Sequence, residues 1–216
     1  MNNMRVFYEK KERVKYISHL DTAHCMQRAL KRAGLPVWYT EGFNPHMYLT
    51  FAIPLALGYE SECEIMDFRL TEDISPEEVT ERLNRVLPPG FHVLRTDLPV
   101  RKPADIVKAE YAVSFYGDSQ AIEAQLAAFL AQDEILVEKK TKKGLSVVDL
   151  KQEILSCSMQ KQEGSVLLQI VLPAGISKHI NPSLLTDAWM AQADCPADRI
   201  AILKKRVLCQ DGSEFI

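Results

Sequence analysis

The chain has 216 residues, of which 47% are hydrophobic and 25% charged, and its formal net charge is -3. This is the composition of an ordinary globular protein that can bury a sizeable core, and it excludes a disordered chain. The longest apolar runs are far shorter than the roughly 20 residues of a membrane-spanning helix. The N-terminus alternates apolar and charged residues instead of carrying a signal peptide's hydrophobic block, so we expect a cytoplasmic protein with no membrane partner.

Charge is distributed unevenly along the chain. Residues 1–55 carry 8 Lys/Arg against 4 Asp/Glu, whereas residues 56–99 carry 4 against 10. A local basic face can contact phosphates even in a chain with negative net charge. The five cysteines are widely and irregularly spaced, so we predict neither a disulfide framework nor a metal site.

The sequence of the first half of the chain predicts extended segments and two helices. Each helix opens with a capping box, at Ser18 and at Ser75, and each ends at a glycine or proline signal. Alternating apolar and polar residues predict the extended segments, with a turn at 41–46. These segments are 4–8, 14–17, 36–40, 47–51, 62–70 and 91–98.

The resulting order βαββαβ is that of the ferredoxin-like split βαβ. The second half repeats it approximately, with helices at 119–131 and from Asn181 to Trp189. Its extended segments are 108–116, 135–139, 145–154, 155–160, 166–172 and 199–209. With PVRKP at 99–103 as linker, we predict an α+β protein of tandem ferredoxin-like units with antiparallel sheets, at 1–100 and 101–216. The alternative is a single larger α+β domain.

The densest polar chemistry lies between Ser18 and Ser61, where two histidines are the candidate catalytic residues. His19 lies in the first turn of a helix, where the helix dipole favours a neutral imidazole. His46 follows Asn44-Pro45, and if that turn folds back over the helix the two histidines form one anion-binding site. A structural turn and a helix-end residue are the alternative. The predicted ligand-binding residues are Ser18, His19, Asp21, Tyr39, Phe43, Asn44 and His46.

Basic and aromatic residues of the same region suggest RNA contacts. His24, Arg28, Lys31 and Arg32 form a polar helix face that can contact phosphates, although a solvated face explains them without any partner. The nearby cations are Lys10, Lys11, Arg13 and Lys15. The candidates for base stacking are Trp38, Tyr39, Phe43 and Tyr48. Further cations that contact phosphate or guard strand edges are Lys139, Lys140, Lys142, Lys143, Lys204, Lys205 and Arg206.

The pieces ISHLD, QRALKRAGLP, GFNPHMYLTFAIPLALGYESECE and MDFRL resemble the uncharacterised radical-SAM-linked protein family. Its members occur alone or fused behind a radical SAM domain. The resemblance implies an accessory or substrate-recognition protein, directed at RNA modification or metabolism, that serves a separate radical SAM protein. It also implies that the iron-sulfur cluster and S-adenosylmethionine belong to that partner and that this chain holds no cofactor.

Two other functions stay open. Tandem ferredoxin-like units with a histidine near the first helix resemble, more distantly, the metal-independent endoribonucleases that process CRISPR repeats. Such an enzyme would use His19 and His46 as its acid and base, but the C-terminal stretch AILKKRVLCQDGSEFI lacks the glycine-rich loop of that family. The remaining alternative is a small-molecule or peptide-binding adaptor.

Overall fold

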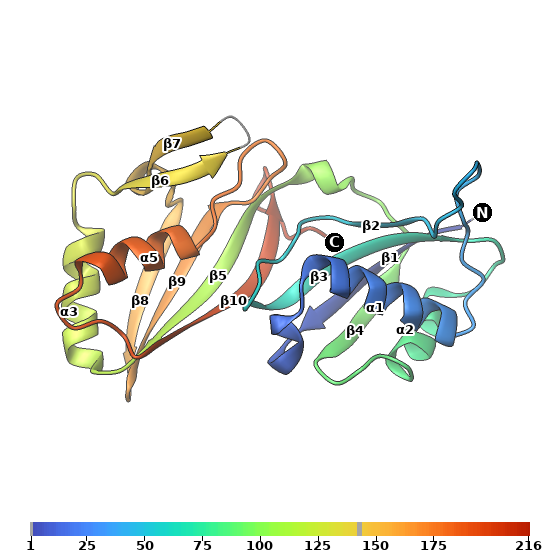
Figure 1. Ribbon diagram of the computed structural model, residues 1–216, viewed down its shortest axis with the longest axis horizontal. Helices are drawn as coiled ribbons and strands as arrows, with labels where there is room; N and C mark the ends of the chain where they lie inside the picture. The colour runs from blue at the N-terminus through green and yellow to red at the C-terminus, as the bar shows by residue number, and fades with distance from the viewer. Residues whose placement is uncertain (1, 142–143) are drawn as a thin grey trace. The chain divides into compact units, whose positions relative to one another are not determined.

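The computed structural model describes residues 2–141 and 144–216, and the chain divides into two compact units. The first unit is Met1–Asp105 with Phe215–Ile216, and the second is Ile106–Glu214. Both are α+β with antiparallel strand pairs (Figure 1). The predicted division fell after residue 100. In the structure the linker belongs to the first unit, where Arg5 Nη1 donates to the Arg101 carbonyl at 2.8 Å.

In the first unit two helices cover one face of a four-stranded sheet (Figure 1). The strand order is β4-β1-β3-β2. Side chains of the helices, such as Met26 and Leu83, pack with Val6 and Met66 of the sheet in one buried cluster. The elements are β1 (Asn2–Lys10), the 3-10 helix η1 (Glu12–Tyr16), α1 (His19–Arg32), β2 (Leu49–Phe51), β3 (Glu60–Leu70), α2 (Pro76–Asn84), β4 (Phe91–Asp97) and the 3-10 helix η2 (Pro103–Asp105).

The two predicted helix starts are confirmed. Ser18 Oγ accepts a hydrogen bond from the Asp21 amide at 3.1 Å, and Ser75 Oγ accepts one from the Glu78 amide at 3.2 Å. Each bond satisfies an amide that has no partner within its helix. The local sequence signal therefore determines where α1 and α2 begin.

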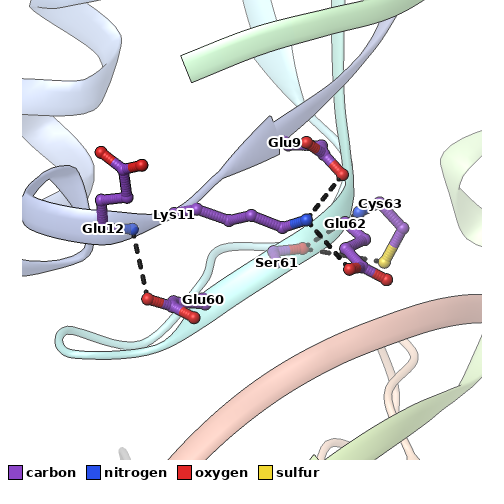
Figure 2. A network of polar contacts seen from close by, with 7 residues as sticks. All are labelled: Glu9, Lys11, Glu12, Glu60, Ser61, Glu62 and Cys63. Carbon is purple, nitrogen blue, oxygen red and sulfur yellow. Dashed lines mark hydrogen bonds and ion pairs between the residues drawn. The ribbon is translucent and has the colours of Figure 1, made fainter. Parts of the chain in front are cut away.

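The predicted extended segment at 14–17 is wrong, because η1 occupies it up to Tyr16. Glu12 has φ of 55°, which turns the chain out of β1, and its amide donates to the Glu60 carboxylate at 3.2 Å (Figure 2). Lys11 Nζ bridges the carboxylates of Glu9 and Glu62 at 2.8 and 2.9 Å in the same network. These contacts with β3 hold η1 in place, and the local sequence pattern could not predict them because β3 is distant along the chain.

The segment predicted as a strand at 36–40 makes only isolated bridges. Val37 pairs with Leu70, and Tyr39 pairs with Met47. The second bridge holds the Glu41–His46 turn between antiparallel segments. The predicted turn is therefore present, but its flanks are shorter than expected.

The second unit has the sheet order β10-β5-β9-β8 and a separate β6-β7 hairpin. Phe115 and Trp189 pack edge to face in its core, with ring centroids 5.0 Å apart. The strand predicted over 145–154 ends at Asp149, whose Oδ1 accepts from the Lys151 amide and starts a short helix. The elements are β5 (Ile106–Tyr116), α3 (Ser119–Leu130), β6 (Leu136–Thr141), β7 (Gly144–Asp149), α4 (Leu150–Glu153), β8 (Ser156–Gln162), β9 (Ser165–Pro173), α5 (Ser183–Gln192) and β10 (Arg199–Cys209).

Within residues 2–141 and 144–216, none of the helices combines the length and apolar character needed to span a bilayer.

Candidate functional site

Helix α1 buries one side and exposes a row of cations on the other. Thr22, Met26, Ala29 and Leu30 are buried against the sheet. The exposed residues His24, Arg28, Lys31 and Arg32 define what we call the cationic ridge. Arg32 Nη2 donates to the Val86 carbonyl at 2.9 Å, so the C-terminal end of the ridge is tied to the end of α2.

The ridge meets exposed aromatic rings at its C-terminal half. Lys31 Nζ lies 5.8 Å from the centroid of the Tyr39 ring, which is 39% exposed. Phe43, a few residues further on, is completely exposed, at 107%. A single exposed apolar side chain is common on protein surfaces, but a cation beside free π-faces suits an anionic, stacking ligand.

His46 closes the turn that carries Phe43. Its backbone amide donates to Thr40 Oγ1 at 3.1 Å, and its ring Nδ1 lies 2.9 Å from the same oxygen. The Asn44 carbonyl lies 3.3 Å from that ring nitrogen. Thr40, Asn44 and His46 thus form a closed turn with Phe43 at its outer side. In this arrangement the bonds of His46 to Thr40 fix the conformation of the turn.

Ser18, His19 and Asp21 lie at the other end of α1. The His19 ring packs edge-on against Phe51 of β2, with centroids 5.0 Å apart. Ser18 Oγ donates to the Asp21 carboxylate at 2.6 Å, and this bond lowers the pKa of Asp21, with smaller contributions from its backbone bond and from His24 and Arg28. A carboxylate held ionised in the first turn also complements the helix dipole.

The two histidines have different neighbours. His19 begins the helix, whereas His46 bonds to Thr40, next to the Tyr39 ring that Lys31 contacts. Twelve residues of helix between His19 and Lys31 correspond to about 18 Å. The predicted seven-residue binding set is therefore divided into Ser18, His19 and Asp21 at one end and Tyr39, Phe43, Asn44 and His46 at the other.

Three of the cations that precede α1 are engaged within the protein, whereas Arg13 is exposed. Lys11 pairs with Glu62 of the acidic stretch in β3 (Figure 2). Lys15 pairs with Glu60 of the same stretch at 3.1 Å. Lys10 is buried and donates to the Ile17 carbonyl. Cations of the basic stretch 1–55 thus pair with carboxylates of the acidic stretch 56–99 and stabilise the fold.

Two of the predicted cations of the second unit are similarly occupied. Lys139 Nζ donates to the His179 carbonyl, and Arg206 Nε donates to Glu110 at 3.0 Å. Burial, with help from Lys204 and Lys139, lowers the pKa of His179. Lys142 and Lys143, two of the predicted phosphate contacts, lie outside the described residues.

The five cysteines are free thiols, four of them on different elements and Cys195 between α5 and β10. Across the described ranges, no group of three or more His, Cys, Asp or Glu residues is placed to hold a metal ion.

A family model described as "Uncharacterized protein conserved in bacteria (DUF2344)" matches residues 3–182. The chain belongs to the DUF2344 family. The DUF2344 match includes α1, the cationic ridge, and the turn with Tyr39 and Phe43. The comparison with curated proteins gives no match.

One solved structure resembling this DUF2344 chain is described as "Crystal Structure of an Unknown Protein from Galdieria sulphuraria". The two chains are 15% identical, with 94% of this chain and 98% of that chain covered, and the TM-score is 0.29. A likeness of this degree supports no inference about function.

Sequence reasoning missed one polar group of this DUF2344 chain, centred on Arg69. Strand alternation in MDFRL contained the signal, because Phe68 and Leu70 are buried and Arg69 between them must point to the other face of the sheet. There Arg69 contacts Trp38 and Tyr48, which the sequence suggested only as separate stacking candidates.

Proposed function

We propose that the chain is an accessory RNA-recognition protein, and that the cationic ridge of α1 together with Tyr39 and Phe43 binds single-stranded RNA. The observation that carries this proposal is the Lys31 ammonium lying over the exposed Tyr39 ring. It joins a phosphate-binding group to a stacking surface. Proteins recognise unpaired RNA with these two groups, because every base has a π-face and every nucleotide carries a phosphate.

The parts of this surface have separable roles in the proposal. Arg28 and Lys31 contact phosphates and give binding its salt dependence. Phe43 offers a ring with both faces open, and stacking of one base is worth about 1–3 kcal/mol. The closed turn of Thr40 and His46 fixes the backbone that carries Phe43, which reduces the ordering cost of binding.

We also propose that each unit is a ferredoxin-like fold. Numbered within its own unit, and leaving aside the β6-β7 hairpin, each sheet has the order 4-1-3-2, with two longer helices in the connections. This is the arrangement expected of a split βαβ unit. The second unit differs by the inserted hairpin and by α4.

The partner in this proposal is a radical SAM protein, as the resemblance of ISHLD and GFNPHMYLTF implies. The DUF2344 chain would present RNA, while the partner supplies the iron-sulfur cluster and S-adenosylmethionine. Affinity capture with the tagged chain tests this part by the iron content and identity of the captured protein. Capture of RNA with no iron protein would overturn the partnership and leave the RNA proposal standing.

The test of RNA binding is the fluorescence anisotropy of a labelled single-stranded RNA pool of random sequence. Arg28→Gln/Lys31→Gln should raise Kd by roughly tenfold or more, as loss of charged contacts does, and should lower the slope of log K against log salt by about 1.4. Phe43→Ser should raise Kd with the salt slope unchanged.

The matched control is Lys161→Gln/Lys178→Gln, which removes the same charge from exposed residues of the second unit. It should leave both Kd and slope near those of the wild type. Equal losses in the two double variants would mean that only net charge matters, and would reject the ridge as the site.

A further inference from the structure

We infer a separate phosphate-binding site in a hollow of the first unit, built around Arg69 on the sheet face opposite to α1 and α2. Arg69 lies between Phe68 and Leu70, whose side chains are 1% and 0% exposed in the helix-covered core. Because side chains alternate along a strand, the guanidinium of Arg69 lies on the other face. The inference does not depend on RNA binding at the cationic ridge.

The Arg69 guanidinium is held from several sides. Nε donates to Asn3 Oδ1 at 2.8 Å, and Cζ lies 4.6 Å from the Tyr48 ring centroid and 5.3 Å from that of Trp38. These rings pack edge to face, 5.8 Å apart. A guanidinium fixed in this way loses little freedom on binding an anion, and its remaining N–H groups form the fork that matches phosphate.

Arg69 has no carboxylate partner among the residues that the structure describes, unlike its neighbour Arg5. Arg5 is 2% exposed and binds both oxygens of Asp67, with Nε and Nη2 at 2.8 and 2.7 Å. Since Asp67 is engaged by this bidentate contact, it does not neutralise Arg69. The Arg5–Asp67 pair instead forms part of the lining of the hollow. The bond from Arg5 to the Arg101 carbonyl holds the 99–103 segment beside it.

The hollow has the size and charge for a phosphate group. Its volume is about 310 Å³, and its lining includes the cations Arg69 and Lys102 besides the paired Arg5 and Asp67. Lys102 is exposed, and its backbone amide is anchored to the Asp105 carboxylate at 2.9 Å. The Lys102 ammonium can therefore join the Arg69 fork on one anion. A terminal phosphate of RNA and the phosphate of a free nucleotide share this chemistry.

The rim suits a nucleotide rather than a bare ion. Pro99, Val100 and Pro103 line it, and Val100 is 89% exposed. Such an apolar edge beside an anion site can contact a sugar or base attached to the phosphate.

The experiment compares binding of one single-stranded RNA with a 5′-phosphate and with a 5′-hydroxyl, and of AMP, by titration calorimetry. The site predicts a preference for a phosphorylated probe, and Arg69→Gln should reduce that preference by roughly tenfold, the value of one charged hydrogen-bonding contact. A preference for 5′-phosphate RNA alone identifies an RNA end as the ligand. Binding of AMP that requires Arg69 identifies a free nucleotide.

Arg95→Gln is the control, because Arg95 stacks on Phe7 and pairs with Asp97 in the same unit but does not line the hollow. It should not change the preference. If Arg69→Gln unfolds the protein, Lys102→Gln on the exposed rim replaces it, with a severalfold loss expected. Equal binding of the phosphorylated and hydroxyl RNAs together with no binding of AMP would overturn the inference, whatever the ridge variants show.

Discussion

At the residue scale, Tyr8 and Gly90 have surroundings that tolerate little change of charge or volume. Tyr8 is 1% exposed on β1, and burial, followed by the charges of Glu64 and Cys25, raises the pKa of its phenol well above the ordinary value. Gly90 has φ of +92°, and its carbonyl accepts from the Lys11 amide at 2.8 Å. The sequence marked Gly90 only as a helix stop, because its contact with Lys11 is distant along the chain.

The Tyr8 phenol predicts loss of stability at high pH. A raised pKa in the folded state means that the protonated phenol stabilises the fold fully below about pH 10, and that this contribution is lost as pH rises further. One such proton accounts for about 1.4 kcal/mol per pH unit. Urea unfolding of Tyr8→Phe should therefore show a shallower fall of the unfolding free energy above pH 10 than the wild type. Identical slopes would show that Tyr8 does not contribute.

Gly90→Ala should destabilise the first unit by roughly 2–4 kcal/mol, from left-handed backbone and overpacking together. A Cβ at Gly90 would lie 2.7 Å from the Lys11 carbonyl oxygen and 2.8 Å from a Val14 methyl carbon. Gly34→Ala is the control, because Gly34 has φ of +64° with nothing within 4 Å. It should cost only roughly 1 kcal/mol. Equal losses of unfolding free energy in urea titrations of the two variants would contradict a close approach of η1 to Gly90.

At the element scale, α1 shows what local sequence can and cannot predict. Its cap at Ser18, its buried side and its cationic ridge all follow from spacing, so each was predictable. The contact of Lys31 with Tyr39 and the separation of His19 from His46 were not, because they depend on how the segment after Gly34 returns along the helix. The failure at 14–17 has the same cause, since Glu60, distant in the sequence, accepts from the Glu12 amide at the start of η1. The failure at 145–154 is local, since Asp149 caps α4 by accepting from the Lys151 amide.

Ser18→Ala tests the cap of α1. It removes the acceptor for the Asp21 amide, and loss of such a cap costs about 0.5–2 kcal/mol. Thermal or urea unfolding followed by circular dichroism should show this loss. Ser18→Asp, which keeps an acceptor, should retain most of the stability. A Ser18→Ala variant with unchanged stability would contradict the assigned helix start.

At the scale of the whole molecule, the sequence predicted an α+β protein with antiparallel sheets and a division near PVRKP. It did not predict that residues 101–105 and Phe215 join the first unit. These contacts reach Arg5, whose Cζ lies 4.8 Å from the Phe215 ring, across most of the chain length. Periodicity reports which face of an element is apolar, and it contains no information on which distant residue covers it.

The candidate site is likewise partly predictable from the sequence. The residue types of the cationic ridge, Tyr39 and Phe43 were recognisable, because the ridge residues recur at helical spacing and the aromatic residues follow directly after the helix. Their grouping at the C-terminal half of α1 required the fold. The ribonuclease hypothesis needs His19 and His46 at one phosphate, whereas the structure packs His19 on Phe51 and bonds His46 to Thr40.

The central claim, that RNA lies on the ridge beside Tyr39 and Phe43, is tested most directly by ultraviolet crosslinking. Single-stranded RNA bound to the full chain would be irradiated, and the crosslinked peptides identified by mass spectrometry. We predict crosslinks at Tyr39 or Phe43, reduced when Arg28 and Lys31 are replaced by glutamine. Crosslinks confined to the second unit, or unchanged in the double variant, would contradict the assignment of this surface.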